Sequence, residues 1–437
     1  MEKIKMTTER LFLRSPNINV CFRIEIEGDF TQNDFAQAVD AVCKRHPLVT
    51  CAVEIDGNHD AWFVQNANPV EVVYYTHEEM PDWKDWYKKT DALPFDLTRG
   101  PLVKICVITG NNHTEIITLG HHVIGDGIGY LNLVKDILLA LDGRLEAAAR
   151  MPPANNKFIK GKKLGLLSRL YAQKLNKEWR KNKTHFSEDE YRAFFMDYRA
   201  KYIPQIYIDS INEDALKRIT ALCKRNKLTV NELLTAAFAT AVADAGAGAD
   251  FAGKETRIGV AASTRGEAAA KPWYCMGNYV TGISVTAACG STNDFMANVK
   301  TITKLVRGEL TNIKKKHAVV NFLGEFDNDL IESIMFASYG NYELPIAKKI
   351  GTIIAEGLEE KGLGVSNLGR HELNNYSKFR VSGLQFIGPA FPANLLSVSI
   401  ITVNNTCTLC LRYNEPEIKL DAVKMVYKKA LELIFNE

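Results

Sequence analysis

Strand-like and helix-like segments alternate along the whole chain, and this alternation restricts the possible folds more than any other feature. The segment NVCFRIEIEG, at 19–28, alternates apolar and polar residues with the period of two expected of a half-buried strand. The next segment, 31–47, places Phe35 and Val42 on one helical face and ends at Pro47. Because this order recurs, the sequence predicts a mixed α/β protein.

The same patterns place the remaining elements. Strands are predicted at 48–56, 61–65, 69–76, 101–110, 113–123, 204–210, 256–264, 278–286, 381–388, 395–404 and 406–414. Helices are predicted at 82–92, 130–141, 212–226, 229–245, 292–310 and 421–435. Turn residues separate 48–56 from 61–65 and 101–110 from 113–123, which predicts that each of these pairs forms adjacent strands.

The chain has 437 residues, more than one hydrophobic core usually supports, and we predict two halves. Between Lys157 and Lys183 there are ten Lys or Arg residues and one acidic residue, with leucines at helical spacing. We interpret this basic amphipathic stretch as a connection. The predicted division is an N-terminal half at 1–150, a basic connecting segment at 151–203 and a C-terminal half at 204–437.

Composition excludes several classes of function. A net charge of +3 is too small to indicate nucleic acid as a partner. The first fifteen residues contain no signal-peptide core, and the most apolar stretch, 233–242, is too short to span a bilayer. Nine scattered cysteines indicate reduced thiols, and the single CxxC, at 407–410, has no second pair or nearby histidine. We therefore expect a cytoplasmic protein with no metal site and no membrane association.

The segment TLGHHVIGDGIGYLNLVKDILLAL, at 118–141, places two histidines where a strand meets a glycine-rich turn. Successive strand residues face opposite sides, so His121 and His122 are expected to point in different directions. One would face a substrate and the other would pack into the scaffold. Imidazole is the side chain whose pKa suits general-base catalysis near neutral pH.

Several interpretations of this turn remain open on the residues alone. A catalytic triad with Asp126 would need a nucleophile, and no G-x-S-x-G occurs. An acidic residue there can instead hold the loop by pairing with a distant arginine. The histidines could simply pack in the core, or could bind a metal with a third ligand from elsewhere. The segment GDGIG could hold phosphate, although it lacks the P-loop lysine.

The run 121–127 matches the pattern HHxxxDG in full. It resembles the superfamily of CoA-dependent acyltransferases and peptide-synthetase condensation domains, which includes chloramphenicol acetyltransferase. The stretches 38–51, 258–267 and 276–285 are also similar to segments of this superfamily. GVSNLG, at 364–369, resembles the Ser-Asn-x-Gly turn of its alcohol-acetyltransferase and condensation branches. The resemblance implies two chloramphenicol-acetyltransferase-like α/β sandwich halves with mixed sheets and an active-site tunnel between them.

The resemblance also implies roles for the residues of the turn. His122 would be the general base, and would take a proton from an alcohol or amine as that group attacks a thioester. His121 would belong to the scaffold. Asp126, followed by Gly127, would be structural, and Arg265 is the candidate for its ion-pair partner. No acyl-enzyme would form, and no bound cofactor is expected.

The negatively charged oxygen of the tetrahedral intermediate needs a hydrogen-bond donor. The candidates are Ser366, Asn367, and a backbone N–H beside them or at Gly127. For Ser366, a plain turn residue is an equally good interpretation.

The resemblance leads first to an acyltransferase that uses acyl-CoA as co-substrate and a small alcohol or amine as acceptor. Lysines at 157–183 or 313–317 would then line the CoA entrance, unless they form only a solvated face. The alternative is a free-standing condensation enzyme whose donor is tethered to a carrier protein, docked by the basic segment. The length leaves no room for a carrier or adenylation region. Three further possibilities rank lower. They are an epimerase, a non-catalytic recruitment module, and a protein whose amphipathic helix at 164–175 lies on a membrane.

Overall fold

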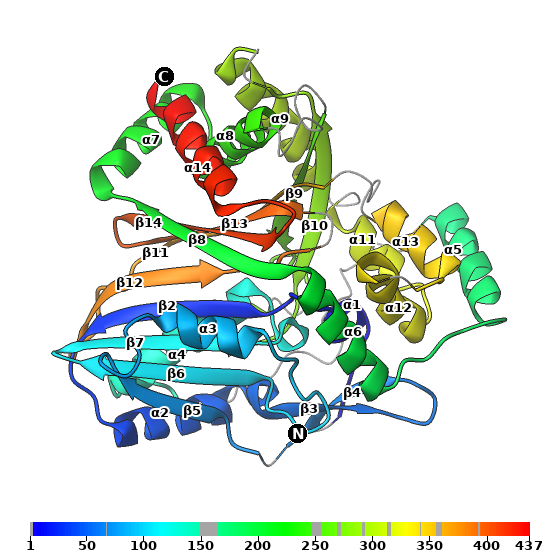
Figure 1. Ribbon diagram of the computed structural model, residues 1–437, viewed down its shortest axis with the longest axis horizontal. Coiled ribbons are helices and arrows are strands. Elements are labelled where there is room, and N and C mark those ends of the chain that lie inside the picture. The colour runs from blue at the N-terminus through cyan, green and yellow to red at the C-terminus, as the bar shows by residue number, and fades with distance from the viewer. Residues whose placement is uncertain are drawn as a thin grey trace.

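The computed structural model shows a mixed α/β protein built from two sheet-rich halves, as the sequence predicted (Figure 1). The residues that it describes are 3–66, 68–148, 165–245, 255–268, 272–290, 293–312, 316–340, 342–354, 361–391 and 394–437. No helix within these ranges combines the length and the hydrophobicity needed to cross a bilayer.

The first large sheet contains five strands. Their order is β12 (Arg380–Ile387), β2 (Val20–Glu27), β7 (His113–Gly120), β6 (Val103–Gly110) and β5 (Glu71–Thr76). Only β5 and β6 pair in parallel, and the other pairs are antiparallel. The predicted pairing of 101–110 with 113–123 is therefore confirmed.

The second large sheet contains six strands. Their order is β10 (Val280–Ala287), β9 (Thr256–Ser263), β11 (Gly362–His371), β13 (Asn394–Val403), β14 (Thr406–Glu415) and β8 (Ile203–Ile211). The central strands β9, β11 and β13 are parallel, whereas the outer pairs are antiparallel. A small third sheet consists of β1 (Ile4–Lys5), β4 (Ala61–Gln65) and β3 (Cys51–Ile55). Its β3–β4 pair is the pair of adjacent strands predicted at 48–56 and 61–65.

Helices cover the sheets in three groups (Figure 1). The first sheet packs with α1 (Arg10–Leu13), α2 (Gln32–Arg45), α3 (Trp83–Asp91) and α4 (Gly127–Leu141). The second sheet packs with α7 (Glu213–Asn226), α8 (Val230–Ala245), α9 (Phe295–Thr311) and α14 (Leu420–Phe435). A lateral group consists of α5 (Leu166–Trp179), α6 (Glu188–Lys201), α11 (Ala318–Leu323), α12 (Asn328–Tyr339) and α13 (Pro345–Ile354). Short 3-10 turns lie at η1 (Pro47–Thr50) and η2 (His122–Ile124).

Two segments from late in the sequence join the N-terminal part of the molecule. Strand β12 pairs along its length with β2, and also contacts β13 and β14 of the second sheet. The helices α11, α12 and α13 contribute to the same hydrophobic core as β2, β6 and β7. The hydrophobic pattern of a strand shows which face is buried but not which strand it will pair with. The placement of β12 therefore depends on tertiary contacts.

The structure corrects the expectation of a turn at 364–369, because these residues lie in strand β11. The register of β11 against β13 shifts between Asn367 and Arg370, so an irregularity exists there inside a strand.

The two cysteines of the CxxC lie on β14 and belong to different hydrophobic clusters. Cys407 packs in the core of the second half, and Cys410 packs in the cluster that contains the aromatic residues of α3. Residues three apart in a strand face opposite sides, which separates the two sulfurs.

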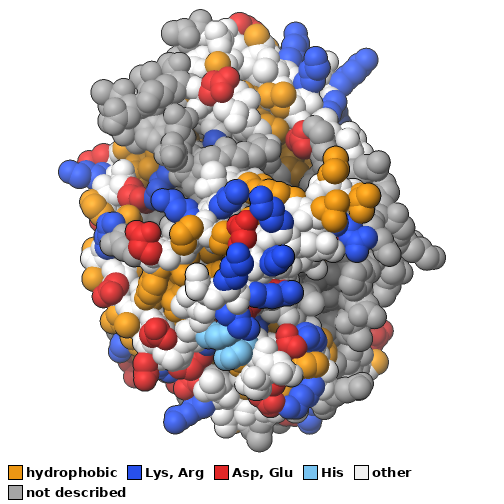
Figure 2. Space-filling view, turned by 90° about the vertical axis from the view of Figure 1, so that its right-hand side faces the viewer, with side chains coloured by type: hydrophobic (Ala, Val, Ile, Leu, Met, Phe, Trp, Pro, Cys, Tyr) orange, Lys and Arg blue, Asp and Glu red, His pale blue; other side chains and the backbone are white. Residues whose placement is uncertain are grey.

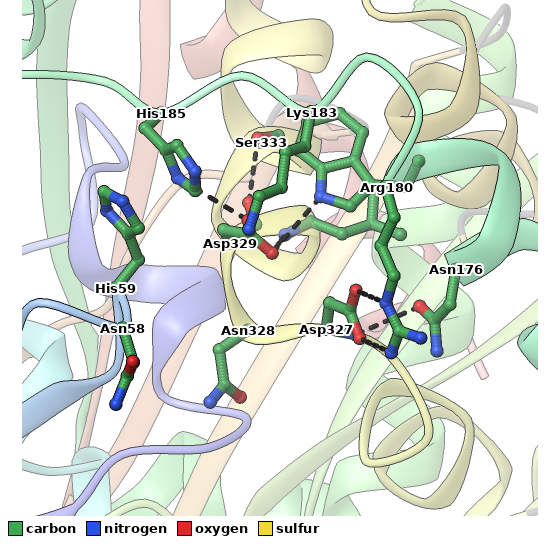
Figure 3. Close-up of polar contacts among 12 residues, drawn as sticks. Asn58, His59, Asn176, Arg180, Lys183, His185, Asp327, Asn328, Asp329 and Ser333 are labelled. Atoms are coloured by element: carbon green, nitrogen blue, oxygen red, sulfur yellow. Dashed lines mark hydrogen bonds and ion pairs between the residues drawn. The ribbon is translucent and has the colours of Figure 1, made fainter.

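The basic connecting segment is described from residue 165 onward, and the lysines at 157, 160, 162 and 163 lie outside the described residues. Positively charged side chains in the described part of this segment form ion pairs with aspartates just before α12 and in its first turn (Figure 3). Arg180 forms two hydrogen bonds with Asp327, and Trp179 and Lys183 contact Asp329. These contacts attach the segment to α12. Part of the positive charge of the segment therefore stabilises the fold.

Candidate active site

The paired histidines lie in a tight connection between β7 and α4. Strand β7 ends at Gly120, His121 remains extended, and His122 begins the 3-10 turn η2. A Cβ atom at Gly120 would lie 2.1 Å from Tyr130 Oη, so only glycine fits there. The Tyr130 hydroxyl donates a hydrogen bond to the carbonyl of His121 at 2.9 Å. The first helical turn of α4 thus packs directly under the histidines.

His122 lies in the wall of a large cavity, and its side chain is almost completely buried. Its ring stacks on Phe12 of α1, with centroids 4.4 Å apart. The ring nitrogen Nδ1 is buried and forms no hydrogen bond within the described structure. Burial lowers the pKa of His122, and the Asp126 carboxylate partly opposes this shift. The imidazole is therefore held neutral, which is the form that can accept a proton.

His121 points into a different environment. Its Nδ1 accepts a hydrogen bond from the backbone N–H of Val123 at 3.2 Å, and its ring forms a T-shaped pair with the ring of Phe95. Burial, and then the neighbouring His122, lower the pKa of His121 to about 3. The two imidazoles thus point in different directions, and His121 is absent from the residues that line the cavity.

Asp126 uses both of its carboxylate oxygens to hold the turn. Oδ1 accepts from the N–H of Gly129 at 2.8 Å, which caps α4, and from Nη2 of Arg265 at 2.6 Å. Oδ2 accepts from the N–H of Tyr279 at 2.9 Å. Asp126 therefore does not orient His122 as a triad aspartate would.

Arg265 is fully buried and connects Asp126 to a loop of the second half. Besides Asp126, its guanidinium donates to the carbonyls of Pro272, Cys275 and Gly277 at 2.5–3.1 Å. The guanidinium also lies over the ring of Tyr279, 4.6 Å from its centroid. The two side chains that the sequence analysis paired are thus in direct contact across 139 residues of sequence.

Asn278 is a site residue to which the sequence analysis gave no role. Its side-chain amide donates to the carbonyls of His122 and Val123, at 2.7 and 2.9 Å. These bonds fix the backbone of η2 to the loop that precedes β10. The only signal in the sequence was the similarity of the segment 276–285 to the acyltransferase superfamily.

Phe12 was also missed, because α1 has only four residues and no periodicity to recognise. The helix is anchored by two buried arginines that share one carboxylate of α12. Arg10 Nη2 and Arg14 Nε lie 2.5 and 2.6 Å from the two oxygens of Glu332. This three-residue ion-pair network holds Phe12 against His122.

The cavity has a volume of about 940 Å³, large enough for a drug-sized ligand. Both halves contribute to its wall. Most described lining residues are apolar or carry small hydroxyl groups, and the charged ones are Asp126, Arg257 and Glu309. Such a lining suits an uncharged acyl chain or acceptor. Within the described part of the chain, the cavity does not bring three potential metal ligands together.

The candidates for the oxyanion site are placed differently. Gly127 and Ser366 line the same cavity as His122. Gly127 is the first residue of α4, where backbone N–H groups have no acceptor within the helix. Asn367 is not among the lining residues. Its side chain donates to Asn231 and accepts from the N–H of Gly369.

Comparisons with solved structures agree with this architecture. Trichothecene 15-O-acetyltransferase TRI3 from Fusarium sporotrichioides superposes with a TM-score of 0.69 at 13% identity, covering 99% of this chain and 94% of that one. The first condensation domain of the calcium-dependent antibiotic synthetase gives a TM-score of 0.68 at 12% identity, covering 99% and 97%. These similarities establish the fold.

Sequence comparisons identify much larger relatives. The hybrid PKS-NRPS synthetase thnA of Trichoderma harzianum is 28% identical over 129 residues, which are 29% of this chain and 3% of the synthetase. A polyketide synthase-nonribosomal peptide synthetase of Aspergillus clavatus is 25% identical over 142 residues, 31% of this chain and 3% of that protein. The chain thus matches only a small part of these relatives' length. A model of the condensation domain matches residues 6–312, which is more than two thirds of the chain. This protein therefore belongs to the condensation-domain family.

Proposed function

We propose that this protein transfers an acyl group from a thioester to the hydroxyl or amino group of a small molecule, with His122 as general base. The observation that carries the proposal is the position of His122, whose neutral imidazole lies in the wall of a cavity between the two halves. Membership of the condensation-domain family supports the class of reaction.

The reaction requires only a direct transfer. The acceptor oxygen or nitrogen attacks the thioester carbonyl while the neutral imidazole of His122 takes its proton. Because an alcohol is about as weakly acidic as water, with a pKa of roughly 15.7, proton removal must accompany the attack. The C–S bond then breaks, the sulfur receives the proton from His122, and the products are an ester or amide and a free thiol. Neither an acyl-enzyme nor a bound cofactor takes part.

The N–H of Gly127 and the hydroxyl of Ser366 are the proposed donors to the negatively charged oxygen of the tetrahedral intermediate. Both residues line the same cavity as His122. The positive end of the α4 dipole adds to the stabilisation at Gly127. Asp126 and Arg265 hold the turn, and Asn278 fixes the backbone of His122.

We infer that the donor is a soluble acyl-CoA and that the reaction occurs in the cytoplasm, where the nine free cysteines would stay reduced. A second candidate is a condensation enzyme with a donor tethered to a carrier protein. Its support is the family itself and the synthetases among the relatives. Part of the basic segment that would dock such a carrier is already paired with Asp327 and Asp329.

The test is the acceptor-dependent release of thiol from a panel of acyl-CoAs and of the same acyl groups on pantetheine-loaded carrier protein. Each donor is combined with a mixed panel of alcohols and amines. We expect acceptor-dependent release from at least one acyl-CoA. Release from the loaded carrier alone would establish the second candidate. Silence with both donor types would contradict acyl transfer.

We expect the acidic limb of the pH profile of kcat/KM to lie below pH ~6.5, the ordinary pKa of histidine. The base must be neutral, and burial lowers the pKa of His122. The rate should therefore stay constant as pH falls to about 6.5 and decline only when the pH passes through the lowered pKa. Initial rates at saturating donor, measured from about pH 4 to pH 8, would show the limb.

Acid unfolding must be separated from this titration. His121 and His122 both have lowered pKa values when folded, so below about pH 6.5 the unfolded chain binds more protons than the folded one. The free energy of unfolding therefore decreases as pH falls. Circular dichroism at each pH would identify the folded range. A limb above pH 7 in folded protein would argue against His122 as the titrating group.

A further inference from the structure

We propose that His77, His113 and Glu115 form a binding site for a divalent cation of the zinc type at the hairpin end of β7, separate from the acyl-transfer cavity. One ligand atom from each of these side chains lies within 4.8 Å of the others. His113 begins β7, whereas His122 follows its other end. Along a strand this separation is roughly 27 Å, so the two sites are independent.

The sheet topology brings the three side chains together. His113 and Glu115 are two residues apart on β7 and share a face of the sheet. His77 follows β5, and its N–H donates to the carbonyl of Thr109 on β6 at 3.2 Å. The residue between the two histidines is Gly110, which pairs with His113. A Cβ atom at Gly110 would lie 3.2 Å from the ring of His77, so the absence of a side chain there lets the rings approach to 5.3 Å.

The contacts among these groups leave their ligand atoms available. Glu115 Oε1 lies 4.0 Å from His77 Nδ1 and 3.8 Å from His113 Nε2, too far for a hydrogen bond in either case. Two ligands of one tetrahedral zinc ion are about 3.3 Å apart. Side-chain movements of about 1.5 Å or less would therefore bring all three ligand atoms onto one ion.

The surroundings of Glu115 match those of a ligating carboxylate. Its second oxygen, Oε2, accepts from Arg23 Nε at 2.7 Å, which orients the group and leaves Oε1 facing the histidines. Arg23 also pairs with Glu25 and lies over the ring of Trp83. With neutral histidines, Arg23, Glu25 and Glu115 together carry one net negative charge, which favours a cation. The two histidines are about one third exposed, so water can reach the ion and complete its coordination.

A second histidine pair provides a matched control. His59 and His185 stack with centroids 3.5 Å apart, close to Asp329 of α12 (Figure 3). Figure 2 shows histidine side chains next to lysines and arginines on the face of the molecule that carries α5 and α12. The neighbouring carboxylate, Asp329, already contacts Trp179 and Lys183, and among the described residues three ligand atoms do not come together there. His59 has a φ of +62°, so asparagine is the substitution that suits its backbone.

The experiment measures Zn²⁺ binding to protein without a histidine tag by isothermal titration calorimetry, and Co²⁺ binding by visible absorption. We expect one equivalent of Zn²⁺ to bind wild type. The double variant His77→Ala/His113→Ala should lose at least about tenfold in affinity, while His59→Asn/His185→Ala should bind as wild type does. The Co²⁺ spectrum should show nitrogen and oxygen ligands without a thiolate band.

Thermal unfolding provides a second readout, because an ion that binds only the folded protein raises its Tm. Zn²⁺ should raise the Tm of wild type and of the control variant but not that of His77→Ala/His113→Ala. Equal Zn²⁺ affinity in all three proteins, a thiolate band with Co²⁺, or no stoichiometric binding to wild type would overturn the proposal. None of these outcomes depends on acyl-transfer activity.

Discussion

Replacement of His122 by alanine is expected to reduce kcat/KM for acyl transfer by about 10²–10⁴-fold, the contribution typical of a general base. The loss should appear mainly in kcat, because the imidazole acts on the acceptor proton in the transition state rather than holding the substrate. The variant also removes the partner on which Phe12 stacks. Steady-state kinetics with the best donor and acceptor from the panel would measure the effect.

Two further variants separate chemistry from packing. His122→Gln keeps a side chain beside Phe12 but cannot act as a base, so its rate should be as low as that of His122→Ala. His185→Ala removes a partly buried histidine that does not line the cavity, and should keep the wild-type rate. Thermal unfolding should show that all variants are folded. A folded His122→Ala protein with wild-type kcat would eliminate His122 as the base.

Breaking the Asp126–Arg265 pair is expected to lower the free energy of unfolding by about 3–5 kcal/mol, since the remaining charge would be buried without its partner. Asp126→Asn leaves the positive charge of Arg265 buried without a partner. Arg265→Met leaves the negative charge of Asp126 buried without a partner. Because each variant alone loses the same interaction, the double variant should lose less than the sum of the two. Denaturant unfolding of the four proteins would measure this coupling.

The exposed pair between Glu27 and Arg380 is the matched control, because it also joins two segments distant in sequence. The Arg380 side chain is 71% exposed, so Glu27→Gln should leave the free energy of unfolding close to that of wild type. Strict additivity of Asp126→Asn and Arg265→Met would show that the buried pair is not coupled. Activity should fall with the stability of the turn, since Asp126 caps the helix that follows His122.

The local elements were accessible from the sequence because their signals are local. The alternation in 19–28 predicted β2, and the turn at 111–112 predicted the pairing of β6 with β7. HHxxxDG led to the fold class because the motif resembles that of a known superfamily and lies in one local unit of strand, turn and helix. A four-residue helix such as α1 has no such signal, so the contact of Phe12 with His122 was not predictable.

The sequence by itself determined which residues form the strand–turn–helix unit around His121 and His122, since hydrophobic period and glycine placement act between neighbours in the chain. Only the tertiary structure decided what surrounds that unit. Asn278 and Phe12, which the sequence analysis did not identify, reach it from segments more than 100 residues away, and β12 returns from residue 380 to pair with β2. Arg265 was a candidate partner of Asp126 only through the family resemblance, and the tertiary structure brings the two side chains together. Such contacts depend on three-dimensional packing and charge pairing. The residues that meet in this way have no fixed spacing along the chain, so the pattern of one sequence does not identify them.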